Sequence, residues 1–192
     1  RTGKRRKGNE MIYFVRHGQT DWNLEKKLQG LVDIPLNETG KQHARDVRDE
    51  LVRGGVAFDV VLASPLKRAR QTADIINEAY SLPITTVDGL KERDFGEFEG
   101  RIKTLHKEWY EDFWNYNKDL HYERAENVQD FVQRVSKQIV KIKDKYAGKN
   151  VLIVAHGGVG LGFSAYFSGV PKNGKLLGLL ISNGETMKFN TE

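Results

Sequence analysis

The 192-residue chain contains no cysteine. This absence excludes disulfide bonds, a thiolate nucleophile and metal sites built on cysteine. No stretch approaches the roughly 18–20 consecutive apolar residues of a membrane-spanning helix. With 39% hydrophobic residues the chain can still bury a packed core. These features are typical of a soluble protein, and the default expectation is a cytoplasmic one.

The net positive charge is concentrated at the start of the sequence. The formal net charge is +5, and the first ten residues carry five basic side chains against Glu10. Residues 11–192 are therefore nearly neutral, so we expect no basic face for nucleic acid. We expect residues 1–10 to be a basic leader outside the fold, with Met11 as the natural start. Residues 11–192 are then expected to form a single domain.

Apolar runs alternate with amphipathic stretches along the chain. Short apolar runs predict buried strands over 11–15, 59–63, 84–87 and 151–155. Helical spacing and capping residues predict helices over 37–53, 64–80, 127–147 and 159–167, the second with Ser64 as N-cap and Pro65 at the first helical position. Strands that alternate with helices predict a three-layer α/β fold, with a mostly parallel central sheet and helices on both faces.

Other segments break this alternation. Residues 19–36 are polar and predict a loop. Residues 176–181 and 185–189 predict two final strands around the Asn183-Gly184 turn, which indicates an antiparallel edge. The aromatic-rich segment 101–126 predicts a small helical insertion over the functional site, with a peripheral packing cluster as the alternative.

Two of the predicted strands are followed by a histidine and then a glycine. Arg16 and His17 follow the first strand, and His156 follows the strand at 151–155. The carboxyl ends of parallel strands lie at one edge of a sheet, where ligands bind. Arg68 lies one turn into the helix after the second strand, where the helix N-terminus and a guanidinium both favour an anion. The two histidines and two arginines therefore suit a dianionic phosphoryl group.

An imidazole nitrogen can attack a phosphoryl group and form a phosphohistidine. The leaving alkoxide then needs a proton, so an acid is required. The glycine-bounded loop at 90–100 offers carboxylates for this role, although charged loops are commonly only solvated. For one histidine alone, a hydrogen bond to a backbone carbonyl would be the ordinary interpretation. The matching context of His17 and His156, together with Arg68, favours the catalytic one.

These segments together resemble the histidine phosphatase superfamily, which has the phosphoglycerate mutase-like fold. The resemblance rests on motifs in the family's order, which are Arg16-His17-Gly18-Gln19-Thr20 with Trp22-Asn23, Ser64-Pro65-Leu66-Lys67-Arg68-Ala69, Leu90-Lys91-Glu92 with Phe95-Gly96, and His156-Gly157-Gly158. It implies that His17 is the phosphorylated nucleophile and Glu92 the proton donor. It also implies no metal or other cofactor.

The resemblance further implies which side chains hold the phosphoryl oxygens, and these are Arg16, Arg68, His156 and Asn23. Weaker candidates for substrate contact are Gly18, Gln19, Thr20, Gln29, Gly30 and Gly157.

Two departures from the family pattern matter, the first for local structure more than for catalysis and the second for the choice between mutase and phosphatase. Family members often carry an arginine where this chain has Leu161. Mutases of the family usually carry a tyrosine at the position of Phe95, and a longer insertion with paired arginines. The short 101–126 segment has no such pair and is more similar to the phosphatase branch, which includes α-ribazole phosphatase-like members.

We therefore predict a phosphatase acting on a small-molecule phosphomonoester, with no nucleic-acid or membrane partner. A cofactor-dependent phosphoglycerate mutase is the first alternative, and a non-catalytic phospho-ligand-binding protein is an alternative of another class. A metal-dependent phosphoesterase using Glu92 and Asp94 is disfavoured, because close clusters of His and Asp ligands are absent. A nucleotide-binding module is disfavoured because the glycines at 157–162 lack the G-x-G-x-x-G spacing.

Overall fold

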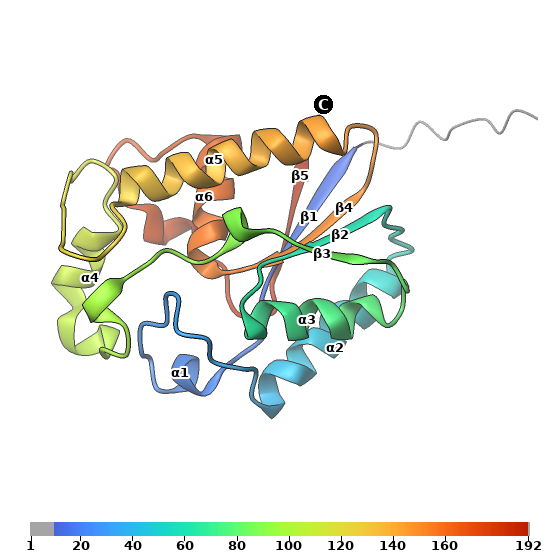
Figure 1. Ribbon diagram of the computed structural model, residues 1–192, viewed down its shortest axis with the longest axis horizontal. Coiled ribbons are helices and arrows are strands. Elements are labelled where there is room, and N and C mark those ends of the chain that lie inside the picture. The colour runs from blue at the N-terminus through green and yellow to red at the C-terminus, as the bar shows by residue number, and fades with distance from the viewer. Residues whose placement is uncertain (1–9, 192) are drawn as a thin grey trace, which may run out of the picture.

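The computed structural model describes residues 10–191, which form a five-stranded sheet with helices on both faces (Figure 1). The strands are β1 (Met11–Arg16), β2 (Val60–Ala63), β3 (Ile84–Thr86), β4 (Val151–Ala155) and β5 (Thr186–Asn190), in the order β3-β2-β4-β1-β5. β5 is antiparallel to β1, and the other neighbours are parallel. This confirms the predicted fold class and its antiparallel edge. Apart from Glu10, the expected leader lies outside the described residues.

The helices form two layers around the sheet. Helices α2 (Glu38–Arg53) and α3 (Lys67–Asn77) cover one face, and α5 (Val128–Lys145) and α6 (Gly157–Ser168) cover the other (Figure 1). Because side chains alternate along a strand, β1 contributes to both cores. Val15 joins the core under α2 and α3, whereas the Phe14 ring lies 4.9 Å from that of Phe163 in α6. The central strand β4 is buried along its whole length.

The helix N-termini agree with the sequence at α2 but not at α3. The Asn37 side chain accepts a hydrogen bond from Gly40 N at 2.9 Å, as its capping role requires. The prediction that Ser64 caps the next helix was wrong, because α3 begins at Lys67 and its N-cap, Leu66, makes no side-chain cap. The Ser64 hydroxyl lies instead 2.7 Å from His156 Nε2, where it satisfies a buried imidazole nitrogen.

Two loop and strand predictions also need correction. Residues 176–181 do not form a strand: Leu176–Leu179 is a 3₁₀ helix, and β5 occupies the edge of β1. A continuous apolar run does not by itself distinguish a strand from other buried structure. The predicted loop at 19–36 contains one helical turn, α1 (Asp21–Leu24), with a Thr20–Asn23 capping box.

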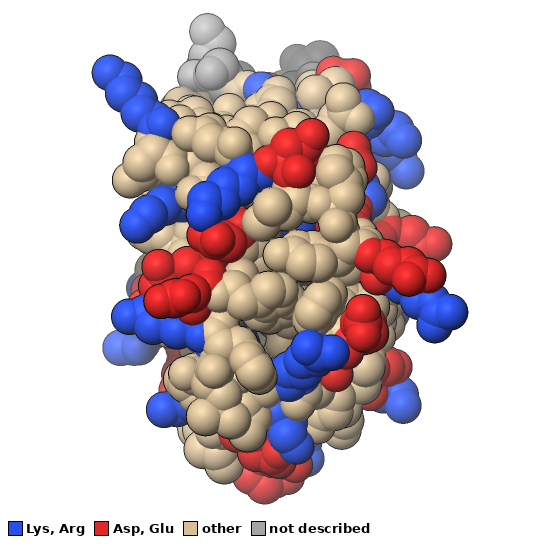
Figure 2. Space-filling view, turned by 90° about the vertical axis from the view of Figure 1, so that its left-hand side faces the viewer, with Lys and Arg blue, Asp and Glu red and all other residues tan. Residues whose placement is uncertain are grey.

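The insertion contains a 3₁₀ helix (Lys103–His106) and α4 (Lys107–Phe113), and shorter 3₁₀ turns lie upstream at Asp88–Leu90 and Gly96–Phe98. Two of its aromatic rings pack against a buried cation, the Arg93 guanidinium, which lies 3.8 Å from the centre of the Phe113 ring and 5.0 Å from that of Trp114. None of the helices in residues 10–191 is long and apolar enough to cross a bilayer. On the face that carries α4, acidic and basic side chains are interspersed (Figure 2).

Candidate active site

Adjacent strands bring the two histidines together. β1 and β4 are parallel neighbours with Arg16 opposite Ala155, so the residues that follow them meet at one sheet edge. The His17 amide donates to Ala155 O at 3.0 Å. The ring centres of His17 and His156 lie 5.2 Å apart. Both side chains are buried.

His17 is oriented by the residue that follows it. Its Nδ1 lies 2.7 Å from Gly18 O, and because a carbonyl only accepts, Nδ1 carries the proton. The pKa of His17 is well below its usual value, first because the ring is buried and then because of the Arg68 and Arg16 charges. The ring is therefore neutral near pH 7, with an unprotonated Nε2. Burial and Arg68 also lower the pKa of His156 well below its usual value.

The two arginines leave donors without partners in the buried site. Arg16 Nη1 donates to Ile181 O at 2.5 Å, and Arg68 donates to Val32 O and Gly30 O at 2.9 and 2.7 Å. The Nε–H of each arginine is buried and has no hydrogen-bond partner among the described residues. Burial lowers the pKa of Arg68 to about 10, so the guanidinium stays charged near neutral pH. Unpaired buried cationic donors of this kind are suited to an anion.

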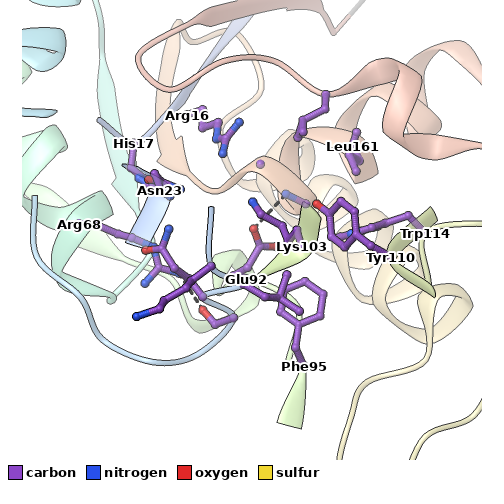
Figure 3. Close-up of a pocket in the computed structure, with 17 residues that line it drawn as sticks. Arg16, His17, Asn23, Arg68, Glu92, Phe95, Lys103, Tyr110, Trp114 and Leu161 are labelled. Carbon is purple, nitrogen blue, oxygen red and sulfur yellow. Dashed lines mark hydrogen bonds between the residues drawn. The ribbon is translucent and has the colours of Figure 1, made fainter. Parts of the chain in front are cut away.

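Glu92 approaches the histidines from the segment that follows β3. Its Oε2 accepts from Gly158 N at 3.0 Å, in the first turn of α6. Its Oε1 accepts from Arg93 N at 2.9 Å. Gly158 permits this contact, because a Cβ at that position would lie 2.2 Å from Glu92 Oε1. The carboxyl group faces the same pocket as His17, Arg16 and Arg68 (Figure 3).

The family model of the histidine phosphatase superfamily (branch 1) matches the sequence over residues 12–190. The chain belongs to this superfamily. The family resemblance read from the sequence motifs is thereby confirmed, and the chain is a phosphatase of the superfamily.

Relatives carry both phosphatase and mutase names. The chain is 43% identical over 146 residues to the uncharacterized phosphatase PhoE of Bacillus subtilis, covering 76% of this chain and 71% of that protein. It is 35% identical over 150 residues to the probable phosphoglycerate mutase GpmB of Citrobacter koseri, covering 76% and 69%. The solved structure of Bacillus stearothermophilus YhfR superposes with a TM-score of 0.82 at 29% identity, covering 93% and 90%.

In this histidine phosphatase, most of the predicted site residues line one pocket, and these are Arg16, His17, Asn23, Gln29, Gly30, Arg68, Glu92 and Gly157. His156 does not line it, although its ring centre lies 5.2 Å from that of His17 and its buried Nδ1 has no partner among the described residues. The weaker candidates Gly18, Gln19 and Thr20 do not line it either. A Cβ on Gly18 would meet Gly40 O at 2.1 Å, Gln19 accepts from Asn37 Nδ2, and Thr20 caps α1.

Asn183, which the sequence places only in a turn, fixes the orientation of Asn23. Asn23 Oδ1 accepts from Thr20 N at 3.1 Å and from Asn183 Nδ2 at 3.2 Å. Asn183 Nδ2 also donates to His17 O at 3.0 Å. With its oxygen engaged in this way, Asn23 keeps its amide donors for the pocket that it lines.

Sequence reasoning missed further pocket residues, among them Lys27, Lys103, Tyr110, Trp114, Leu161 and Leu180 (Figure 3). The insertion supplies Lys103, Tyr110 and Trp114. Burial is the main reason why the pKa of Lys103 falls to about 8 and that of Tyr110 rises to about 12. No local motif marks these residues. Among residues 10–191, no group of three His, Asp or Glu side chains is arranged to hold a metal ion.

Proposed function

We propose that the protein hydrolyses phosphomonoesters through a covalent phosphohistidine on His17. The observation that carries the proposal is the buried His17 ring, with Nδ1 2.7 Å from Gly18 O, beside Arg16 and Arg68, whose buried Nε–H donors have no partner among the described residues. In this proposal Arg16, Arg68, His156 and Asn23 hold the phosphoryl oxygens, and Glu92 supplies the proton.

The proposed reaction has two steps. His17 Nε2 attacks phosphorus, a P–N bond forms as the P–O bond breaks, and the leaving alkoxide takes the Glu92 proton. A water molecule then attacks the phosphohistidine, the Glu92 carboxylate accepts its proton, and the P–N bond breaks to release phosphate. The charge that develops on the transferring group is stabilised by the arginine donors.

Glu92→Gln should impair hydrolysis according to the leaving group. An alkyl phosphate leaves as a strong base and needs the proton, whereas nitrophenyl phosphate leaves as a stable anion. The constant to compare is kcat/KM, which reports only the transfer to His17 and not the hydrolysis step that both substrates share. We expect kcat/KM for an alkyl phosphate to fall by about 10²–10⁴-fold, the usual contribution of general acid catalysis, and kcat/KM for nitrophenyl phosphate to fall far less. Equal losses on both substrates would assign Glu92 to binding or structure. Glu97→Gln, which changes an exposed carboxylate of the same loop, is the matched control.

Hydrolysis should exceed mutase flux. The insertion carries no adjacent arginine pair that could clamp a phosphoglycerate carboxylate, and it places Tyr110 and Trp114 on the pocket wall. The measurement is a panel of phosphomonoesters assayed with and without EDTA, with phosphoglycerate mutase activity followed in parallel. The prediction fails if isomerisation of 3-phosphoglycerate is faster than hydrolysis of the best phosphomonoesters. A small-molecule substrate, a cytoplasmic location and a single domain over residues 11–192 stay predictions from the sequence.

A further inference from the structure

Arg134, a partly exposed residue of α5, reaches the backbone of the segment that carries Glu92. Its Nη1 lies 3.1 Å from Gly89 O and 3.2 Å from Lys91 O. Its Nη2 lies 3.3 Å from Glu92 O. One guanidinium thus contacts three carbonyl oxygens within four residues, directly behind the Glu92 side chain. Arg134 is not among the residues of the phosphoryl pocket.

Glu126 orients this guanidinium. Arg134 Nε and Nη2 donate to the two carboxylate oxygens of Glu126 at 2.7 and 2.9 Å, which is the bidentate geometry that a planar fork favours. The pair is only partly exposed, at 30% and 20% of the two side chains. The backbone of Glu126 is fixed as well, because its amide donates to Asp94 O and its carbonyl accepts from Arg93 Nε, both at 2.8 Å.

The Glu92 segment is anchored after Glu92 by Arg93, whose buried guanidinium donates to Glu126 O and lies 3.8 Å from the centre of the Phe113 ring. After the 3₁₀ turn Asp88–Leu90 it belongs to no helix or strand until Gly96. The Glu92 carboxylate touches the rest of the fold through one hydrogen bond, from Gly158 N, and its other recorded bond is to the adjacent Arg93 amide. The backbone position of Glu92 is therefore set from two sides, by the contacts of Arg93 after it and by Arg134 of α5, which contacts the Glu92 carbonyl and those just before it.

We propose that Arg134, held by Glu126, is a positioning residue that sets the distance between Glu92 and the leaving group. The inference rests on the proposed function, because it needs Glu92 to be the proton donor. A displacement of about 1 Å can lower a rate by about 100-fold when a proton must be delivered along a fixed line. Loss of the Arg134 contact is not expected to weaken phosphoryl binding, because Arg16 and Arg68 do not depend on it.

The test compares two substrates in one variant. Arg134→Gln should lower kcat/KM for an alkyl phosphate by about 10- to 100-fold and kcat/KM for nitrophenyl phosphate by less than about 3-fold, because kcat/KM reports only the step in which the leaving group departs. A merely structural role would reduce the amount of active enzyme and lower both rates equally. Arg48→Gln is the control, since it breaks an arginine–glutamate pair with Glu78 on another part of the surface. For Arg48→Gln, the ratio of the rate constants with the alkyl phosphate and with nitrophenyl phosphate should equal the wild-type ratio.

Two further variants keep the test decisive. Glu126→Gln removes the carboxylate that orients Arg134 and should shift the ratio in the same direction, which covers the case in which Arg134→Gln does not fold. In a protein that already carries Glu92→Gln, Arg134→Gln should not lower the rate constant for the alkyl phosphate any further relative to that for nitrophenyl phosphate. If Glu92→Gln itself shows no dependence on the leaving group, the proposed function is at fault. The inference about Arg134 is overturned if Glu92→Gln does depend on the leaving group but Arg134→Gln and Glu126→Gln lower the rate constants with both substrates equally.

Discussion

His17→Ala is expected to abolish turnover, with a loss of at least about 10⁴-fold in kcat, the scale seen when a covalent nucleophile is removed. The chain has no cysteine to replace it, and the nearby Ser64 hydroxyl is engaged with His156. In the wild type, acid-labile and alkali-stable label from a phosphorylated substrate should appear on His17.

Because its pKa lies well below the usual value, His17 remains unprotonated as the pH falls from 7 to 6. Labelling should therefore show no loss from protonation of His17 across that interval.

The control for this experiment is His121→Ala. His121 is exposed and pairs with Asp119, outside the pocket, so its removal should leave both labelling and turnover unchanged. Stable label on a hydroxyl group, such as that of Ser64, would contradict the mechanism. So would a His17→Ala protein that retains normal turnover per folded molecule.

Arg16→Lys and Arg68→Lys should each lower kcat/KM by about 10²–10³-fold, the range found when one donor to a developing anion is removed. Lysine keeps the positive charge but cannot reproduce the fork of the guanidinium. The Nε–H that each arginine leaves unpaired in the buried site has no counterpart in lysine. The rates are measured with a good phosphomonoester, and inhibition by inorganic phosphate should weaken in parallel.

The same two variants should unfold no more than about 4–8 °C below the wild-type protein. Arg68 also donates to Gly30 O and Val32 O, so its replacement loses at most two hydrogen bonds, at about 1 kcal/mol each. Arg70→Lys, two residues further along α3 and paired with Asp74 on the surface, should change neither property. A collapse of stability with normal activity per folded molecule would show that the arginine in question serves the fold and not the reaction.

The sequence was sufficient to predict which residues lie at the sheet edge that carries the candidate site, because they occupy regular positions at the ends of strands and helices. Arg16 and His17 follow a recognisable strand, and His156 follows another. Arg68 is the second residue of α3, and its approximate position was predicted although the cap residue was not. The long amphipathic helix predicted over 127–147 is Val128–Lys145 in the structure. Regular periodicity and the rule that parallel strands end together supply all of this.

Only the tertiary structure decided which side chains support that edge. Ser64 was predicted to cap a helix and contacts His156, while Asn183 was predicted to lie in a turn and holds both His17 O and Asn23. Arg134 had the appearance of a polar residue on an amphipathic helix, yet it contacts the Glu92 segment some 40 residues away along the chain. Such contacts are fixed by the packing of distant segments and leave no periodic signal. The sequence by itself therefore determined which side chains are candidates for the site, and the fold determined the hydrogen bonds that orient them.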